Sequence, residues 1–402
     1  MSILVSLVGL GFLILIHEAG HFFVARAVGM NPRKFYVGFP PALVKAQRNG
    51  IEYGIGAIPL GGYVKIPGMH RPAAGDLDVH FGRAVDEDPS VRRPVEELRR
   101  RLEESDYEGA RGAVAGLGES VRTAEVSPLA RKAAERGLTD VDDALGPDAY
   151  WRAKIWKRVA VIFAGPAANL VLAVILFALL FMAGGGKATQ TVDEVAPSAP
   201  ARTMGLQAGD RIVAIDGEAV EADQIAARIS GSGGKPLTVT VVRERKTITL
   251  GPVEPRRTDG AYRLGFVLRG EGLGAGESIW QAVRVTGIVT KEIGASVGRL
   301  VTGSGRDEIS SPVGITQASS EAVKQGADAY LWVLGLISLS LALLNLLPLL
   351  PLDGGHIAFS LLEGIRGRAV KREIYDRVSM VGIAIVLLLF FIGLSNDIGR
   401  LN

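Results

Sequence analysis

The hydrophobic positions of this chain gather into four long runs separated by polar stretches. Each run is close to the roughly 20 residues that a helix needs to cross a bilayer, and each carries few charges. A buried core helix is the alternative, but soluble helices seldom run this long without a polar face. The pattern therefore predicts about four transmembrane helices. The runs are Ile3–Ile16, which resumes beyond a short polar motif, Val159–Ala183, Tyr330–Leu352 and Val378–Leu394.

The first run is interpreted as a retained helix and not as a signal peptide. It lacks a basic segment before the apolar run and a small-residue cleavage site, and apolar residues continue beyond it. Basic residues follow this helix, precede the second and fill the connection between the third and fourth. Because Lys and Arg mark cytoplasmic loops, we expect both termini outside, with residues 30–157 and 354–377 inside and 184–327 outside.

Composition agrees with this segregation of apolar and soluble parts. The chain has 402 residues, of which 48% are hydrophobic and 22% charged. The hydrophobic share makes disorder improbable. Without cysteine, disulfides and cysteine-ligated metal sites are excluded. The net charge of +3 reflects the expected topology, and we expect no nucleic-acid partner.

Two soluble stretches are expected on the inside. Residues 50–67 alternate β-branched and aromatic residues around a glycine pair, which predicts a β-hairpin. This hairpin is either an ordinary cytoplasmic element or an exposed edge that pairs with an extended peptide. Residues 71–150 are rich in Arg, Glu, Asp and Ala, as in a solvated helical insertion or a partly disordered segment, and no chemistry is assigned to them.

Two further stretches are expected on the outside. Residues 188–268 alternate strand, turn and helix patterns, as in a compact α/β module, and their order is similar to that of a PDZ domain. The similarity rests on Gly205–Asp210 and the following residues 211–217; Leu264–Phe266 matches a carboxylate-binding loop, and a purely structural role for that loop is the alternative. Residues 276–303 predict an amphipathic helix that lies on the membrane surface or packs on the module.

Candidate chemistry lies inside the first apolar run, in the motif HEAGH. His17 and His21 are four residues apart, so both imidazoles project from one side of a helix and can share a zinc ion. Glu18 lies beside them and could take a proton from a metal-bound water. Such polar groups in an apolar helix are costly unless they are paired or ligated. Since about fourteen apolar residues precede His17, the site is expected toward the cytoplasmic face.

A catalytic zinc needs a third protein ligand and an open position. Asp353 is the best candidate, because it lies where the third run reaches the same face and because Pro348 and Pro351 break the helix there. His356 is ranked well below it as a rival ligand.

Together these motifs resemble the site-2 protease family of intramembrane zinc metalloproteases. The likeness rests on HEAGH, on FAGPAAN at 163–169, on the PDZ-like module and on NLLPLLPLDGGH at 345–356. The stretches 54–69 and 311–315 also look like family segments. The closest similarity is to bacterial RseP-type members, here with one PDZ domain where the best-known relatives carry two. The inner segment 71–150 has no family role that can be transferred.

The resemblance implies a single Zn²⁺ per chain held by His17, His21 and Asp353, with Glu18 as the general base. It implies that Asn345 and Asn169 hold or orient substrate, and that the hairpin, with Gly61, Gly62 and Tyr63, is a membrane-facing β element that binds substrate by strand addition.

The expected activity is hydrolysis of peptide bonds within the membrane-spanning segments of single-pass proteins. An anti-sigma factor or a signal-peptide remnant would be the substrate, the lipid bilayer the other partner, and the bacterial inner (cell) membrane the location. The expected PDZ-like module binds a newly exposed C-terminus or excludes bulky substrates by size. An inactive scaffold that displays a PDZ domain and a metal transporter are the alternatives; the complete motif set and the lack of internal repeats argue against them.

The expected fold class is a multi-pass α-helical membrane protein with an inserted extracytoplasmic PDZ-like α/β domain and a cytoplasmic membrane-associated β-hairpin. The expected divisions are residues 1–29, the first transmembrane helix; 30–70, the loop with the hairpin; 71–157, the charged insertion; 158–184, the second transmembrane helix; 185–270, the PDZ-like domain; 271–327, the amphipathic helix and linker; 328–353, the third transmembrane helix; 354–377, a basic cytoplasmic loop; and 378–396, the fourth transmembrane helix.

Overall fold

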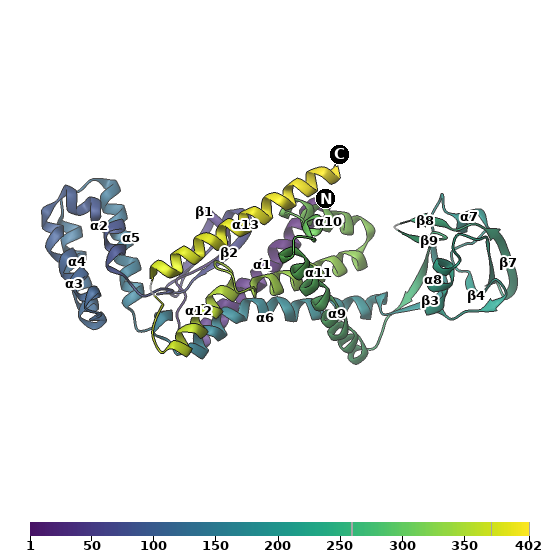
Figure 1. Cartoon of the computed structure of the whole chain (residues 1–402), viewed down its shortest axis with the longest axis horizontal. Helices are drawn as coiled ribbons and strands as arrows, with labels where there is room; N and C mark the ends of the chain where they lie inside the picture. The colour runs from purple at the N-terminus through teal and green to yellow at the C-terminus, as the bar shows by residue number, and fades with distance from the viewer. Residues whose placement is uncertain (259, 371, 402) are drawn as a thin grey trace. The chain divides into compact units, whose positions relative to one another are not determined.

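The computed structural model describes residues 1–258, 260–370 and 372–401. The chain divides into two compact units, each described here by itself. The first comprises residues 1–173, 290–324 and the chain from Leu336 onward, and the second comprises residues 174–289 and 325–335. Figure 1 shows the elements of both units along the chain.

Four helices among the described residues are long and apolar enough to cross a membrane, which confirms the expected number of spans. They include α1 (Ser2–Ala27), α6 (Ile155–Leu180, continued by a π-helical turn at Phe181–Gly185), α11 (Ala327–Asn345) and α13 (Arg372–Leu401). The third is shorter than expected. It ends at Asn345, and the residues before Asp353 are irregular, as the prolines there require.

The connection between the third and fourth spans is mostly helical, whereas the sequence predicted a basic loop over 354–377. Helix α12 (Asp353–Arg366) begins at Asp353. It is followed by Gly367, which adopts a left-handed conformation. Two glycines let its first turn fold back on the irregular segment. A Cβ on Gly354 would lie 2.2 Å from the Leu346 carbonyl oxygen, and one on Gly355 would lie 2.6 Å from the Leu350 nitrogen.

The β element that follows α1 is a small sheet and not an isolated hairpin. Strands β1 (Lys34–Arg48) and β2 (Ile51–Lys65) are joined by a tight turn at Asn49 and Gly50, both with positive φ. Residues 42–48 pair with 51–56 across this turn. Residues 34–37 pair with 52–55 on one side and with 62–65 on the other. The two arms of the predicted hairpin therefore flank another segment, and residues 62–65 form one edge of the sheet.

The charged segment is an ordered helical bundle, so partial disorder is the wrong alternative. Its amphipathic helices bury a common core that includes Leu77, Phe81, Leu98 and Leu117. Arg and Glu side chains pair on the outside, as between Arg100 and Glu97. The helices, drawn in blue in Figure 1, are α2 (Ala74–Glu87), α3 (Arg92–Glu103), α4 (Tyr107–Thr123) and α5 (Pro128–Leu145).

The second unit contains an antiparallel sheet in the order β10-β3-β4-β6-β7, with β5 beside β4 and a separate β8–β9 pair. Apolar residues of the sheet and of two helices form its core. The elements are β3 (Lys187–Val195), α7 (Pro200–Thr203), β4 (Arg211–Ile215), β5 (Glu218–Ala219), α8 (Ala222–Gly231), β6 (Leu237–Arg243), β7 (Lys246–Val253), β8 (Arg256–Thr258), β9 (Ala261–Arg263) and β10 (Phe266–Glu271).

The loop of residues 205–210 in this unit is held by one buried carboxylate. Asp210 is 1% exposed, and its oxygens accept hydrogen bonds from the Gln207 amide at 2.8 Å and from the Arg243 guanidinium at 2.7 Å. Gly205 and Gly209 adopt positive φ, which glycine tolerates without strain. The motif singled out in the sequence thus closes a turn. The carbonyls of Leu264 and Gly265 accept backbone hydrogen bonds within the same unit.

Two more helices, α9 and α10, lie between β10 and the third span along the chain. The expected amphipathic helix over 276–303 is α9 (Ala275–Val301). It is followed by α10 (Pro312–Gln325), whose first turn is capped from the last span. Asp397 of α13 accepts hydrogen bonds from the Ser311 amide, the Ser311 hydroxyl and the Gly314 amide. This buried carboxylate joins the segment 311–315 to the fourth span.

Candidate metal centre and active site

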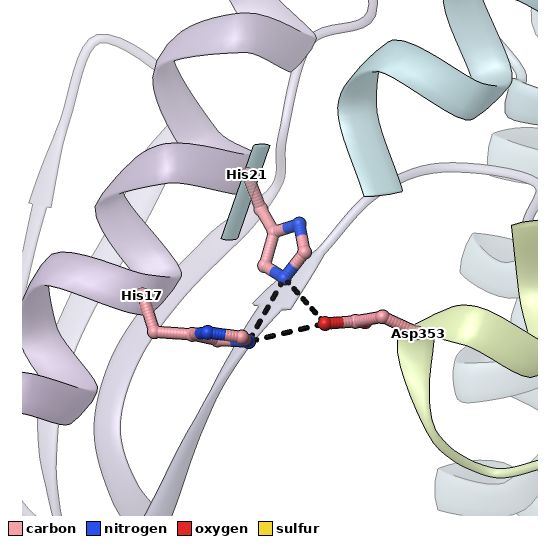
Figure 2. Close-up of side chains that lie close together, drawn as sticks. All are labelled: His17, His21 and Asp353. Carbon is pink, nitrogen blue, oxygen red and sulfur yellow. Dashed lines mark hydrogen bonds and ion pairs between the residues drawn. The ribbon is translucent and has the colours of Figure 1, made fainter. Parts of the chain in front are cut away.

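Three side chains from α1 and α12 meet at one point, as Figure 2 shows. The Nε2 atoms of His17 and His21 lie 3.2 Å apart. Oδ2 of Asp353 lies 3.2 Å from the first and 3.4 Å from the second. Among the described residues, only these form a group of three with metal-ligand character. The structure therefore brings together the three residues that the sequence singled out as ligands.

The donor set fits zinc in both chemistry and size. Zinc binds imidazole nitrogen and carboxylate oxygen at about 2.0–2.2 Å in tetrahedral geometry, so neighbouring donor atoms lie about 3.3–3.5 Å apart. The observed spacings of 3.2, 3.2 and 3.4 Å are close to this value. Oδ2 of Asp353 is buried, and within the described part of the chain it has no hydrogen-bond partner besides the ion-pair contacts with the two imidazoles. A buried carboxylate oxygen without a donor is costly unless a cation satisfies it.

The outer ring nitrogens of both histidines face polar groups of α6. Nδ1 of His21 lies 2.8 Å from the Val161 carbonyl oxygen, which can accept its proton and leaves Nε2 free to bind a metal. Nδ1 of His17 lies 3.5 Å from the side-chain amide of Asn169. Asn169 is fully buried, and its Oδ1 has no hydrogen-bond partner among the residues that the structure describes. A half-turn of that amide would let Oδ1 accept from His17, because the two ends of an amide are interchangeable in shape.

Two glycines allow α1 and α6 to approach this closely. A Cβ on Gly20 would lie 2.3 Å from the Ala164 carbonyl oxygen, and a Cβ on Gly165 would lie 2.2 Å from His21 Nε2. No side chain fits at either position. Gly165 belongs to the motif FAGPAAN, but no role was predicted for it. The local sequence indicates only a glycine one turn before Asn169 in an apolar helix.

Glu18 is next to the first histidine and faces the sheet formed by β1 and β2. It is 9% exposed, and the backbone of Val64 lies beside its carboxylate. A Cβ on Gly62 would lie 2.8 Å from Glu18 Cγ. The sheet edge at 62–65 therefore lies against the carboxylate that the sequence singled out as a base. Sequence reasoning named Gly62 but missed the contact through Val64.

The other candidate residues do not belong to the group of three ligands. Tyr63 stacks on Tyr36 with ring centroids 5.1 Å apart, which fixes its side chain on the sheet. A Cβ on Gly61 would lie 2.5 Å from the Phe39 ring. Asn345 is half-buried at the end of α11. His356, the rival ligand, is hydrogen-bonded to the Tyr375 hydroxyl and does not belong to the three-residue group.

The two histidines and the carboxylate lie at the spacing of tetrahedral zinc ligands, with a glutamate beside them. In a chain with four helices that could cross a membrane, this site defines a membrane zinc metalloprotease. The model of peptidase family M50 matches residues 5–389. The chain belongs to this family, the site-2 proteases. This confirms the expected enzyme class and cofactor, and the scaffold and transporter alternatives are set aside.

Curated relatives agree over nearly the whole length. The chain is 30% identical to the zinc metalloprotease RasP of Geobacillus kaustophilus, covering 99% of this chain and 98% of RasP. It is 31% identical to the protein LL2128 of Lactococcus lactis, whose name also carries the words zinc metalloprotease, over 97% of this chain and 96% of that protein. Eep of Enterococcus faecalis, named as a protease, is 27% identical over 99% of both chains.

Proposed function

We propose that this zinc metalloprotease is an intramembrane endopeptidase that cleaves the membrane-spanning segments of single-pass proteins. The observation that carries the proposal is the position of the metal-ligand group. His17 and His21 lie within an apolar helix long enough to span a bilayer, and a sheet edge lies beside the adjacent Glu18. A protease centre built into such a helix is suited to substrates that lie in the same membrane.

The zinc ligands in this proposal are His17, His21 and Asp353. When bound, zinc polarises the scissile carbonyl and lowers the pKa of the attacking water. Glu18 accepts a proton from that water as the water oxygen bonds to the carbonyl carbon. Glu18 then passes the proton to the leaving amine. The Val161 carbonyl and Asn169 keep the imidazoles oriented throughout. Asn169 thus acts on a ligand, whereas Asn345 remains the candidate for holding substrate.

The substrate is presented as an extended strand in this mechanism. A helical segment hides its amides in internal hydrogen bonds, so it must unwind before hydrolysis. The edge formed by residues 62–65 is paired with 34–37 on one side only. Pairing of an unwound segment with this edge supplies backbone hydrogen bonds and offsets the unwinding cost.

The proposed topology places the site toward the cytoplasmic face of a bacterial inner membrane. The basic residues before α6 and between α12 and α13 support this orientation. Both termini and the β3–β10 module are then outside. We propose that this module is PDZ-like and controls substrate access, either by binding a newly exposed C-terminus or by excluding large external domains. The turn held by Asp210 supports the PDZ assignment.

The test uses the full chain in lipid vesicles with a single-span substrate. Mass spectrometry of the products should place the cut within the spanning segment, and a soluble peptide of the same sequence should be cleaved much more slowly. Cleavage only outside the span would contradict the proposal. Deleting residues 188–268 separates the two gating modes, because size exclusion predicts that uncut, full-length substrates become cleavable and C-terminus binding predicts lost activity. Anti-sigma factors and signal-peptide remnants are the two substrate classes to compare.

A further inference from the structure

The helical bundle α2–α5 contacts the sheet formed by β1 and β2 through one carboxylate that interacts with two cations. Asp143 of α5 accepts a hydrogen bond from Arg33 Nε at 2.7 Å through Oδ1. Its Oδ2 lies 3.3 Å from Lys65 Nζ. Arg33 also donates to Asp148 at 3.0 Å, and Lys65 donates to Asp140 at 2.7 Å. Two cations of the sheet thus meet a group of acids at the end of the bundle.

Burial of Asp143 makes loss of a partner more costly here than in an ordinary surface ion pair. Asp143 is 7% exposed, so its charge depends on the two cations. Burial works against protonated Lys65, but hydrogen bonds and charge attraction from Asp140 and Asp143 outweigh it and raise the pKa of Lys65. Lys65 therefore stays protonated around neutral pH. Removal of Lys65 leaves the buried Asp143 carboxylate with Arg33 as its remaining cation, and removal of the Asp143 charge leaves Arg33 and Lys65 with one acid each.

The same strand reaches the active-site glutamate. Lys65 ends the segment 62–65, and the Lys65 carbonyl accepts a hydrogen bond from the Arg33 amide at 2.7 Å. The backbone of the preceding residue, Val64, lies beside the Glu18 carboxylate. Gly62 lies against Glu18 Cγ. A short run of chain therefore contacts the bundle at one end and Glu18 along its length.

We propose that Asp143 is a positioning residue, and that docking of the bundle onto Arg33 and Lys65 holds the strand 62–65 in place against Glu18. Undocking of the bundle would loosen the strand and slow hydrolysis without removing a metal ligand. The segment 71–150 would then be a control element of the protease. The effect on turnover rests on the proposed function, whereas the effect on the strand does not.

Hydrogen exchange on the full chain with zinc tests the structural part. Asp143→Asn weakens the contact from the bundle by removing the shared charge, and Lys65→Met weakens it from the sheet by removing one cation, so a folding defect in one variant does not decide the result. Both should speed exchange over residues 62–65 about tenfold. Protection over residues 110–121 in the bundle core should be unchanged. The matched control is Asp78→Asn, which removes an exposed ion pair with Arg99 inside the same bundle.

Turnover is measured on the same preparations with a single-span substrate. We expect kcat to fall about tenfold in Asp143→Asn and Lys65→Met, since small misplacements of reacting groups are costly. Zinc content and the activity of Asp78→Asn should match the wild type. Unchanged exchange over 62–65 in both variants would overturn the proposal, as would faster exchange with unchanged kcat. If the wild type cleaves no membrane substrate, the proposed function fails while the exchange data still decide the docking claim.

Discussion

Nε2 of His17 in α1 lies 3.2 Å from Oδ2 of Asp353 at the start of α12. The two residues come from opposite ends of the chain, and nothing between them in sequence forces them together. They meet because α11 ends at Asn345 and two glycines fold the following loop tightly onto α12. The third ligand is therefore supplied by the break in a spanning helix.

The ligand assignment predicts the outcome of removing Asp353. Asp353→Ala should lose most of its zinc, because two histidines alone leave the ion with too few protein ligands. Zinc per chain, measured by atomic emission after purification in detergent, checks this. The control is His356→Ala on the same helix, which should keep its zinc. Zinc retained in Asp353→Ala, or lost in His356→Ala, would exchange the roles of the two residues.

The contact between Asn169 and His17 predicts a split between the two candidate asparagines. Asn169→Ala should weaken zinc affinity about 10–100-fold, the usual cost of losing a partner that orients a ligand. Asn345→Ala should raise KM and leave zinc affinity unchanged. Competition with a zinc chelator, paired with steady-state kinetics, distinguishes them. Equal zinc affinities in wild type and Asn169→Ala would return Asn169 to a role in substrate binding.

Helix packing predicts that Gly165 tolerates no side chain. The methyl group of Gly165→Ala would overlap His21 Nε2, so this variant should lose zinc and activity together. Gly11→Ala is the matched control on α1, since a Cβ there meets nothing within 4 Å. The control should bind zinc normally. Full zinc occupancy in Gly165→Ala would show that α1 and α6 can separate at no cost.

Much of the site follows from local sequence, and the rest depends on long-range pairing. The spacing of His17 and His21 fixes one helix face, and the prolines before Asp353 indicate an irregular segment. The position of residues 34–37 between the two arms of the predicted hairpin has no local signal. Neither has the contact of Asp143 with Lys65, because each residue alone has the pattern of a solvated charge.

The bundle and the helix breaks illustrate the same limit. The segment 71–150 has apolar residues at helical spacing, but its many charges indicated a solvated or partly disordered segment. The packing of Leu98, Leu117 and their neighbours into one core was therefore not predicted. Helix α12 was predicted as a basic loop because its charges were read for topology. Its first turn becomes stable only through the close backbone contacts that Gly354 and Gly355 permit.

The ion pair of the buried Asp210 in the β3–β10 module predicts a dependence on pH. Burial alone would raise the pKa of Asp210, but hydrogen bonds from Arg243 and from the Gln207 amide lower it. A lowered pKa in the folded state stabilises the module above the unfolded value of about 3.9, and this stability is lost as pH falls through the folded value. Hydrogen exchange of residues 237–243 across pH 3–7, with rates corrected for intrinsic chemistry, should show it.

Asp210→Asn should remove that pH dependence and destabilise the module by about 1–3 kcal/mol at pH 7. Asp193→Asn is the control, because its ion pair with Arg269 is exposed on both sides and should contribute little. Similar losses in the two variants would show that burial of Asp210 has no special weight.

The most direct test of the central claim is the cleavage of a single-span substrate by Glu18→Gln in lipid vesicles, with zinc content measured on the same sample. Gln keeps the shape of the side chain and cannot take up a proton. We expect normal zinc content and a fall in kcat of about 10²–10⁴-fold, the range set by general acid–base catalysis. Cleavage at the wild-type rate with full zinc occupancy would contradict the account of Glu18 as the base.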